Sequence, residues 1–120
     1  MQLHKDLNVY KVSIEFVTEI YKLTENFPKE EKYGLNSQMG RAAISIPSNI
    51  SEGAGRLSQK EFKNFLSIAS GSASEVETQL TICFNLKYIN EQDLKDFLTK
   101  ISQIKKMCYG LIRKINSKLK

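Results

Sequence analysis

The residue types that usually perform acid–base, nucleophilic or metal chemistry are scarce in this sequence. His4 is the only histidine, and it lies at the start of the chain, where ordered structure is least common. A hydrolase needs a nucleophile beside a base and an orienting group, and a di-metal bundle needs paired glutamates and Glu-x-x-His motifs. The sequence contains neither pattern. It therefore predicts a protein that is not an enzyme and that has no metal site and no cofactor.

The two cysteines, Cys83 and Cys108, lie far apart in the sequence, and both fall within apolar helical patterns. They lack the Cys-x-x-Cys spacing of a metal or redox site. Buried free cysteines usually act as small hydrophobic residues, and this is the prediction for both. A disulfide between them is the alternative.

Positive charge accumulates at the C-terminal end of the sequence. Of 18 basic and 13 acidic residues, eight and three lie in residues 91–120, so residues 1–90 carry ten of each. No acidic residue follows Asp96. Such a segment attracts polyanions, which indicates nucleic acid or an acidic protein as partner. Alternatively, lysines at the end of a last helix complement the helix dipole and keep the protein soluble.

A second polar pattern lies near the middle of the chain, where residues recur at intervals of four, four, three and four: Arg41, Ser45, Asn49, Glu52 and Arg56. On a helix this spacing places all five on one side. Two interpretations remain open. Ser45, Asn49 and Glu52, with Glu75 of the next helix, form a structural polar network, or Arg41 and Arg56 contact phosphate.

Apolar residues recur at helical spacing in four segments, at about residues 6–25, 35–54, 58–87 and 90–119. Alternating strand patterns are absent over any useful length, and the connections are too short for crossovers. The sequence therefore predicts a single all-α domain over residues 1–120, an antiparallel up-down-up-down four-helix bundle. No run approaches a membrane span or the core of a signal peptide, which predicts a cytoplasmic protein without membrane contact.

Local signals place the helix starts. Ser58 and Glu61 have capping-box spacing, and Leu57 and Phe62 are placed to form a hydrophobic staple across that cap. Asn36 or Ser37 is expected to cap the start of the helix over residues 35–54.

Small residues form two patches, at Ala42-Ala43 and from Ala69 to Ala73. Gly71 lowers helix propensity in the second patch, so a neighbouring backbone is expected to pack closely against it. The two patches exceed what one bundle core needs. They predict that the protein forms a homo-oligomer.

Several motifs together resemble those of one family. They are Asp6-Leu-x-Val9-Tyr10, Tyr33-Gly34-Leu35-x-x-Gln38, Arg41-Ala-Ala-x-Ser45-Ile-Pro47-Ser-Asn49-Ile-x-Glu52-Gly53-x-Gly55-Arg56, and Glu61-Phe62-x-x-Phe65-Leu66. This set resembles the bacterial 23S ribosomal RNA intervening-sequence proteins, whose relatives include the accessory protein of diversity-generating retroelements. The resemblance implies a four-helix bundle that assembles as a homopentamer. It also implies a noncatalytic role linked to RNA or DNA, and a reverse-transcriptase-like protein as a possible partner.

The sequence departs from the family pattern at Gly40, where the resemblance implies a second arginine beside Arg41. This departure shifts the expected nucleic-acid contacts to the last helix, at Lys105, Lys106, Arg113 and Lys114, with Arg41 and Arg56 as further candidates. The leading hypothesis is an oligomeric, RNA-associated accessory protein with a basic surface. The alternative is a protein-interaction scaffold that docks an acidic protein partner.

Overall fold

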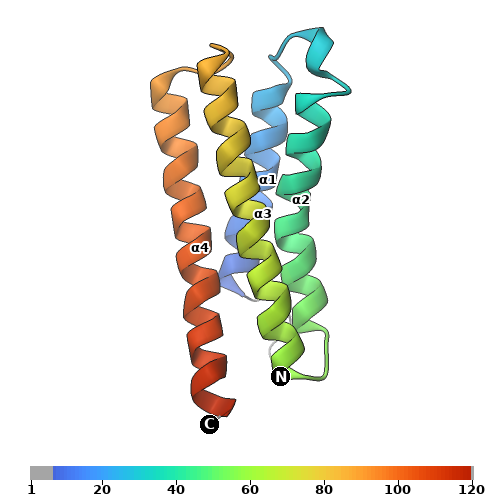
Figure 1. Ribbon diagram of the computed structural model, residues 1–120, viewed down its shortest axis with the longest axis vertical. Helices are drawn as coiled ribbons and strands as arrows, with labels where there is room; N and C mark the ends of the chain where they lie inside the picture. Colours follow the sequence, from blue (N-terminus) through green and yellow to red (C-terminus); the bar gives the residue numbers. More distant parts are fainter. Residues whose placement is uncertain (1–6, 120) are drawn as a thin grey trace.

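Residues 7–119, which the structure describes, form four α-helices and one short 3-10 helix in a computed structural model. The elements are α1 (Asn8–Thr24), η2 (Lys29–Glu31), α2 (Leu35–Ala54), α3 (Gln59–Asn85) and α4 (Glu91–Leu119). Successive helices run antiparallel, and no strand occurs among these residues (Figure 1). The predicted all-α, up-down-up-down four-helix bundle is confirmed. The predicted start of the first helix at residue 6 and the lone histidine, His4, lie outside the described residues.

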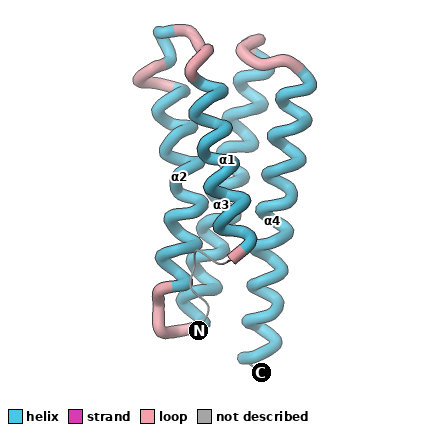
Figure 2. The backbone as a smooth tube through the Cα atoms, turned by 180° about the vertical axis from the view of Figure 1, so that it is seen from behind, coloured by secondary structure: helices cyan, strands magenta, loops and turns pink. Residues whose placement is uncertain are grey.

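The helices occupy the corners of an elongated bundle with extents of 49 × 23 × 19 Å. α2 packs against α1 and α3, α3 packs against α4, and a thinner contact between α1 and α4 closes the square. Seen from behind, α1 lies between α2 and α4, in front of α3 (Figure 2). α2 and α4 therefore stand at opposite corners, which decides which basic residues share a surface.

The apolar stripe of each helix faces a common core. Its largest fully buried side chains include Phe16, Ile20, Met39, Ile46, Ile50, Leu66, Leu80, Ile101 and Ile104. The rings of Phe16 and Phe97 meet edge to face at 6.0 Å between centroids, which joins α1 to α4.

Both cysteines are free and buried in this core, as predicted. The Cys83 thiol donates to the Met39 sulfur at 3.5 Å. Burial disfavours the thiolate, and it raises the pKa of Cys83 and of Cys108 to about 11. The two thiols therefore act as small hydrophobic side chains rather than as nucleophiles.

α2 and α3 share the most extensive contact of any two helices, and they approach closely at Gly53. A Cβ atom on Gly53 would lie 2.6 Å from the Cβ of Phe65 and 3.3 Å from the carbonyl oxygen of Phe62, so no side chain fits there. Small buried side chains continue this seam from both helices, namely Ala42, Ala43, Ala69 and Ala73. The alanines thus serve packing within one chain, and they do not support the oligomer that was predicted from them.

Gly71 does not have the role expected from the sequence. It lies on the exposed side of α3, and a Cβ added there would meet no atom within 4 Å. The prediction that a neighbouring backbone of the same chain packs closely against Gly71 is therefore wrong. The helix turns this position outward, away from α2.

The helix starts confirm some of the expected caps and correct others. The Ser58 hydroxyl accepts from the Glu61 N–H at 3.2 Å, as predicted. Leu57 does not staple that cap, because the short loop after α2 turns it outward until its side chain is 99% exposed. At the start of α2 no side chain caps the helix, and the Asn36 amide instead donates to the Thr24 carbonyl at 3.1 Å.

The turn between α3 and α4 is stabilised by a backbone hydrogen bond to the end of α3 and by a side-chain hydrogen bond to η2. Lys87 adopts a left-handed conformation with φ of 66°, and the Tyr88 N–H returns to the Cys83 carbonyl at 2.9 Å. The Tyr88 hydroxyl donates to the Glu31 carboxylate of η2 at 2.8 Å, and this bond raises the pKa of Tyr88. Asn90 then caps α4, because its side-chain oxygen accepts from the Asp93 N–H at 2.7 Å.

Two glycine-to-alanine substitutions compare a position in the close α2–α3 contact, Gly53, with an exposed position, Gly71. Gly53→Ala is expected to lower the free energy of unfolding by about 1–3 kcal/mol, because the new methyl group overlaps the Cβ atom of Phe65. Gly71→Ala is the matched control and is expected to raise it by up to about 1 kcal/mol, since alanine favours the helix and meets no neighbour. Urea unfolding followed by circular dichroism measures both. Equal stabilities for the two variants would contradict the close α2–α3 approach.

Candidate nucleic-acid interface

The basic residues of α4 fall into two groups with different environments. Lys100 forms an ion pair with Glu19 of α1, and Lys105 lies 3.7 Å from the Glu77 carboxylate of α3. These two lysines connect α4 to its neighbours on either side. Lys105, although a predicted nucleic-acid contact, is therefore already engaged with an acid of its own chain.

The second group is exposed. Lys106, Arg113 and Lys114 make no ion pair with any described residue. Lys106 and Arg113 are two helical turns apart and so lie on the same outward side of α4. Tyr109 lies between them on that side, with 49% of its surface exposed. Three of the four basic residues predicted on the last helix thus remain free to contact an external anion.

Arg41 lies on α2, at the opposite corner of the bundle from α4, whereas Arg56 lies in the loop between α2 and α3. Arg41 is exposed and has no ion-pair partner among residues 7–119. Arg56 is held by Glu52 at 3.0 Å and Glu61 at 3.9 Å, and its guanidinium lies 5.1 Å from the centre of the Phe65 ring. The six predicted contact residues therefore do not form one surface.

The predicted polar network divides into separate parts. The Asn49 amide donates to the Ser45 carbonyl at 2.7 Å and the Ser45 hydroxyl at 2.8 Å, and that hydroxyl is 2.8 Å from the hydroxyl of Ser72. Glu52 belongs to the Arg56 pair instead, and Glu75 is exposed and joins neither group. Sequence reasoning missed Ser72, because its partner becomes apparent only once the register of α2 against α3 is known.

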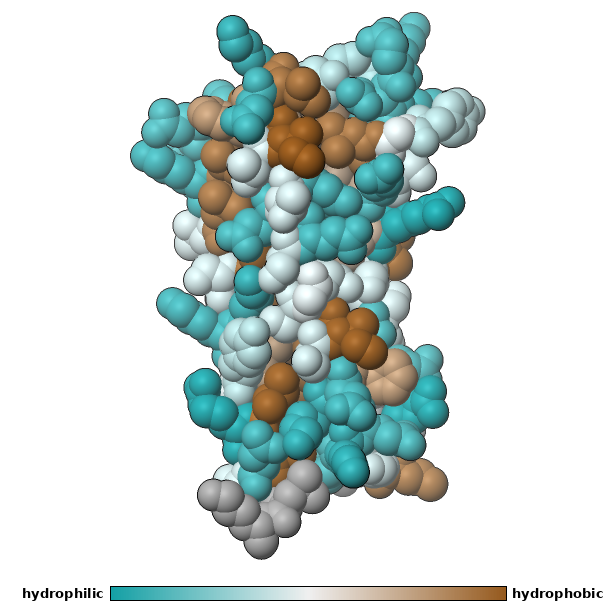
Figure 3. Space-filling model, in the orientation of Figure 1, coloured by the Kyte–Doolittle hydropathy of each residue, from teal (hydrophilic) through white to brown (hydrophobic). Residues whose placement is uncertain are grey.

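Three isoleucines are exposed on the outer sides of α2 and α3. Ile44, Ile68 and Ile82 are each 43–51% exposed, and the small residues Ser48 and Gly71 are exposed near them. On this side of the molecule, near-neutral residues cover the middle of the bundle, with hydrophobic residues gathered in patches (Figure 3). The side-chain oxygen of Gln79 in α3 is buried without a hydrogen-bond donor among the described residues.

The fold and its charged surface define a four-helix-bundle protein with a cationic last helix. No helix among residues 7–119 is long and apolar enough to cross a membrane. The same residues contain no cluster of three or more histidine, cysteine or acidic side chains that could hold a metal ion.

Residues 5–110 match the family model described as 23S rRNA-intervening sequence protein, and the chain belongs to this family. Among solved structures, the chain is similar to a Bacteroides thetaiotaomicron protein of unknown function from the S23 ribosomal protein family. The two share 28% identity with a TM-score of 0.79, over 88% of this chain and 95% of the other. No curated protein matches the chain. The comparisons indicate no enzyme family.

The Ser45–Ser72 contact can be measured by a double-mutant cycle. Ser45→Ala and Ser72→Ala are each expected to destabilise the protein, and their coupling energy is expected to be about 0.5–1.5 kcal/mol, the usual contribution of one hydrogen bond. Chemical unfolding of the wild type, both single variants and the double variant gives this coupling. Purely additive effects would show that the two hydroxyls do not interact in solution.

Proposed function

We propose that this protein is a noncatalytic accessory protein that binds nucleic acid, RNA in particular, through the outward side of α4. The observation that carries the proposal is the set of exposed, unpaired cations at Lys106, Arg113 and Lys114, in a stretch of helix that has no acid after Asp96. Lys100 and Lys105 are excluded from this set because acids of the same chain already engage them.

The geometry favours binding to the phosphate backbone rather than to bases. Cations spaced along one helix match a row of phosphates, and each contact releases condensed counterions, so affinity falls steeply with salt. Tyr109 is the one aromatic side chain placed between the cations, and it offers a single stacking surface to an unpaired base. Sequence preference is therefore expected to be weak.

Self-association is the second part of the proposal. The outer surface of α2 and α3 exposes Ile44, Ile68 and Ile82, and we propose that a second copy packs against these three side chains. The family resemblance implies a homopentamer. Because α4 stands at the opposite corner from α2, such an assembly leaves the basic side of each α4 accessible, and several copies can hold one RNA together.

A second candidate function rests on the same charge. Exposed cations also attract an acidic protein surface, so the chain is alternatively a scaffold for an acidic partner, such as the reverse-transcriptase-like protein that the resemblance implies. Cytoplasmic location is part of both proposals. Co-purification with and without nuclease separates them, because a protein partner survives the treatment and an RNA-bridged one does not.

Replacing the three exposed cations tests the RNA surface. The triple variant Lys106→Ala, Arg113→Ala and Lys114→Ala is expected to bind a structured RNA hairpin at least tenfold more weakly at low salt. The slope of log affinity against log salt is expected to become shallower by about 2–3, since each lost phosphate contact removes close to one unit. Fluorescence anisotropy over a salt series measures both quantities.

The matched control replaces three lysines at the other end of the molecule, Lys22, Lys29 and Lys32, which removes the same charge. This variant is expected to keep most of the affinity and the slope. If both triple variants lose equal affinity, net charge and not the α4 surface is responsible. Absence of wild-type binding at low salt would rule out the RNA function itself.

The proposed subunit interface is tested by placing a charge on it. Ile44→Asp with Ile68→Asp is expected to convert the oligomer into a 13.7 kDa monomer in light scattering, because buried unpaired carboxylates oppose association. Ile14→Asp, at a similarly exposed isoleucine of α1, is the control and should leave the mass unchanged. A wild-type chain that is monomeric at high concentration would end this part of the proposal.

A further inference from the structure

The four helices do not end level, and the mismatch leaves a cavity at one end of the bundle. At about 1.5 Å per residue, the 17 residues of α1 span roughly 25 Å and the 29 residues of α4 roughly 43 Å. The turn after α2, the start of α3 and the end of α4 therefore extend beyond the start of α1 (Figure 1). Beyond Leu7, residues 7–119 supply three helical walls, from α2, α3 and α4, and leave the fourth side open.

This space is a cavity of about 430 Å³, within the size range of pockets for small molecules. Its apolar lining comes from α2, α3, α4 and the residue before α1, in the side chains of Ala54, Phe62, Leu111, Ile115 and Leu7. Leu7 and Ile115 are themselves almost completely buried, so the cavity continues directly from the hydrophobic core. An apolar group that entered it would be removed from water on several sides.

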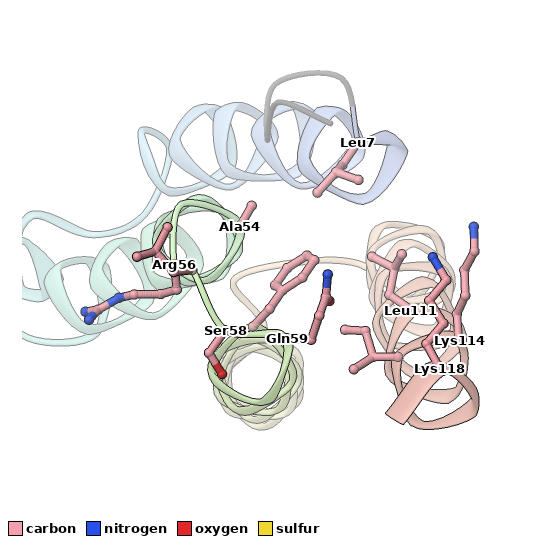
Figure 4. A pocket seen from close by; sticks show the side chains of 11 residues that line it. Leu7, Ala54, Arg56, Ser58, Gln59, Leu111, Lys114 and Lys118 are labelled. Carbon is pink, nitrogen blue, oxygen red and sulfur yellow. The ribbon is translucent and has the colours of Figure 1, made fainter. Parts of the chain in front are cut away.

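The polar lining is cationic at one edge. Lys114 and Lys118 of α4 border the cavity, and neither forms an ion pair with any described residue. Figure 4 shows their side chains and the amide of Gln59 around the opening, whereas the guanidinium of Arg56 turns away from it. Arg56 is committed to Glu52, and no acidic residue is among the described residues that line the cavity.

We propose that this cavity binds a small amphipathic anion, a carboxylate or phosphate ester with an apolar tail. The tail would lie against Phe62, Leu111 and Ile115, and the charged head would stay at the edge beside Lys114 and Lys118. Burying the head among apolar side chains would cost its hydration, so the two lysines fix the orientation of the ligand. An uncharged molecule of the same shape would lose this contact, and a short-chain anion would lose the apolar one.

The site is distinct from the RNA surface in what it recognises. Lys106 and Arg113 lie on the outward side of α4, whereas Leu111 and Ile115 line the cavity. Lys114 borders both regions. Occupation of the cavity would therefore place a negative charge next to one of the proposed phosphate contacts, and a bound amphiphile is expected to weaken RNA binding.

Titration of the full chain, labelled with ¹⁵N, with decanoate tests the proposal. Decanoate is expected to give saturable chemical-shift changes at Ala54, Leu111 and Ile115, and to bind at least tenfold more tightly than decanol or butanoate. Decyl phosphate, the other head group, is expected to bind at least as tightly as decanoate because it carries more charge. Shifts confined to the outer surface of α2 and α3, or equal affinities for decanoate and decanol, would overturn the proposal.

Two sets of variants locate the ligand. Lys114→Gln with Lys118→Gln is expected to reduce decanoate affinity about tenfold, to that of decanol, whereas Lys22→Gln with Lys29→Gln should leave it unchanged. Ala54→Leu is expected to fill the cavity and to abolish binding of both decanoate and decanol. If circular dichroism shows that Ala54→Leu does not fold, Leu111→Phe replaces it. Undiminished binding in a folded cavity-filling variant would show that the ligand lies elsewhere.

Discussion

The close approach of α2 and α3 is the constraint on which the rest of the bundle depends. It requires a position without a side chain at Gly53, where even a methyl group would overlap Phe65. It also brings the hydroxyls of Ser45 and Ser72 within hydrogen-bonding distance across the seam. Once these two helices are paired in this register, the short loop between them has little freedom. On the outward side of the pair, Ile44, Ile68 and Ile82 are left exposed.

The sequence predicted the fold well because helix period and length are local properties. The repeat of apolar residues located all four helices, and the start and end of α2 agreed with the structure at Leu35 and Ala54. Errors arose wherever a side chain needed a partner from another element. Gly71 and Leu57 were both assigned packing roles, yet the orientation of α3 and the course of the loop leave them exposed.

The candidate surfaces were harder to predict for the same reason. Counting charges identified α4 as cationic, but nothing in the sequence distinguishes Lys105, which reaches Glu77, from its neighbour Lys106, which faces outward. One helical step of 100° separates an internal ion pair from an accessible cation. The cavity at the end of the bundle could not be predicted from the sequence, because it arises from the unequal lengths of α1 and α4 rather than from any motif.

The sparse contact between α1 and α4 has a consequence for the motions of the molecule. α1 is held to α4 chiefly by the Phe16–Phe97 ring contact and the Glu19–Lys100 pair, while its other side rests on α2. Separation of α1 from α4 along this edge, and then from α2, would leave the α2–α3 pair intact, so α1 is expected to open as a sub-global unit of lower stability. Amide hydrogens of α1 would then exchange with solvent sooner than those of α3, whose neighbours cover it on both flanks.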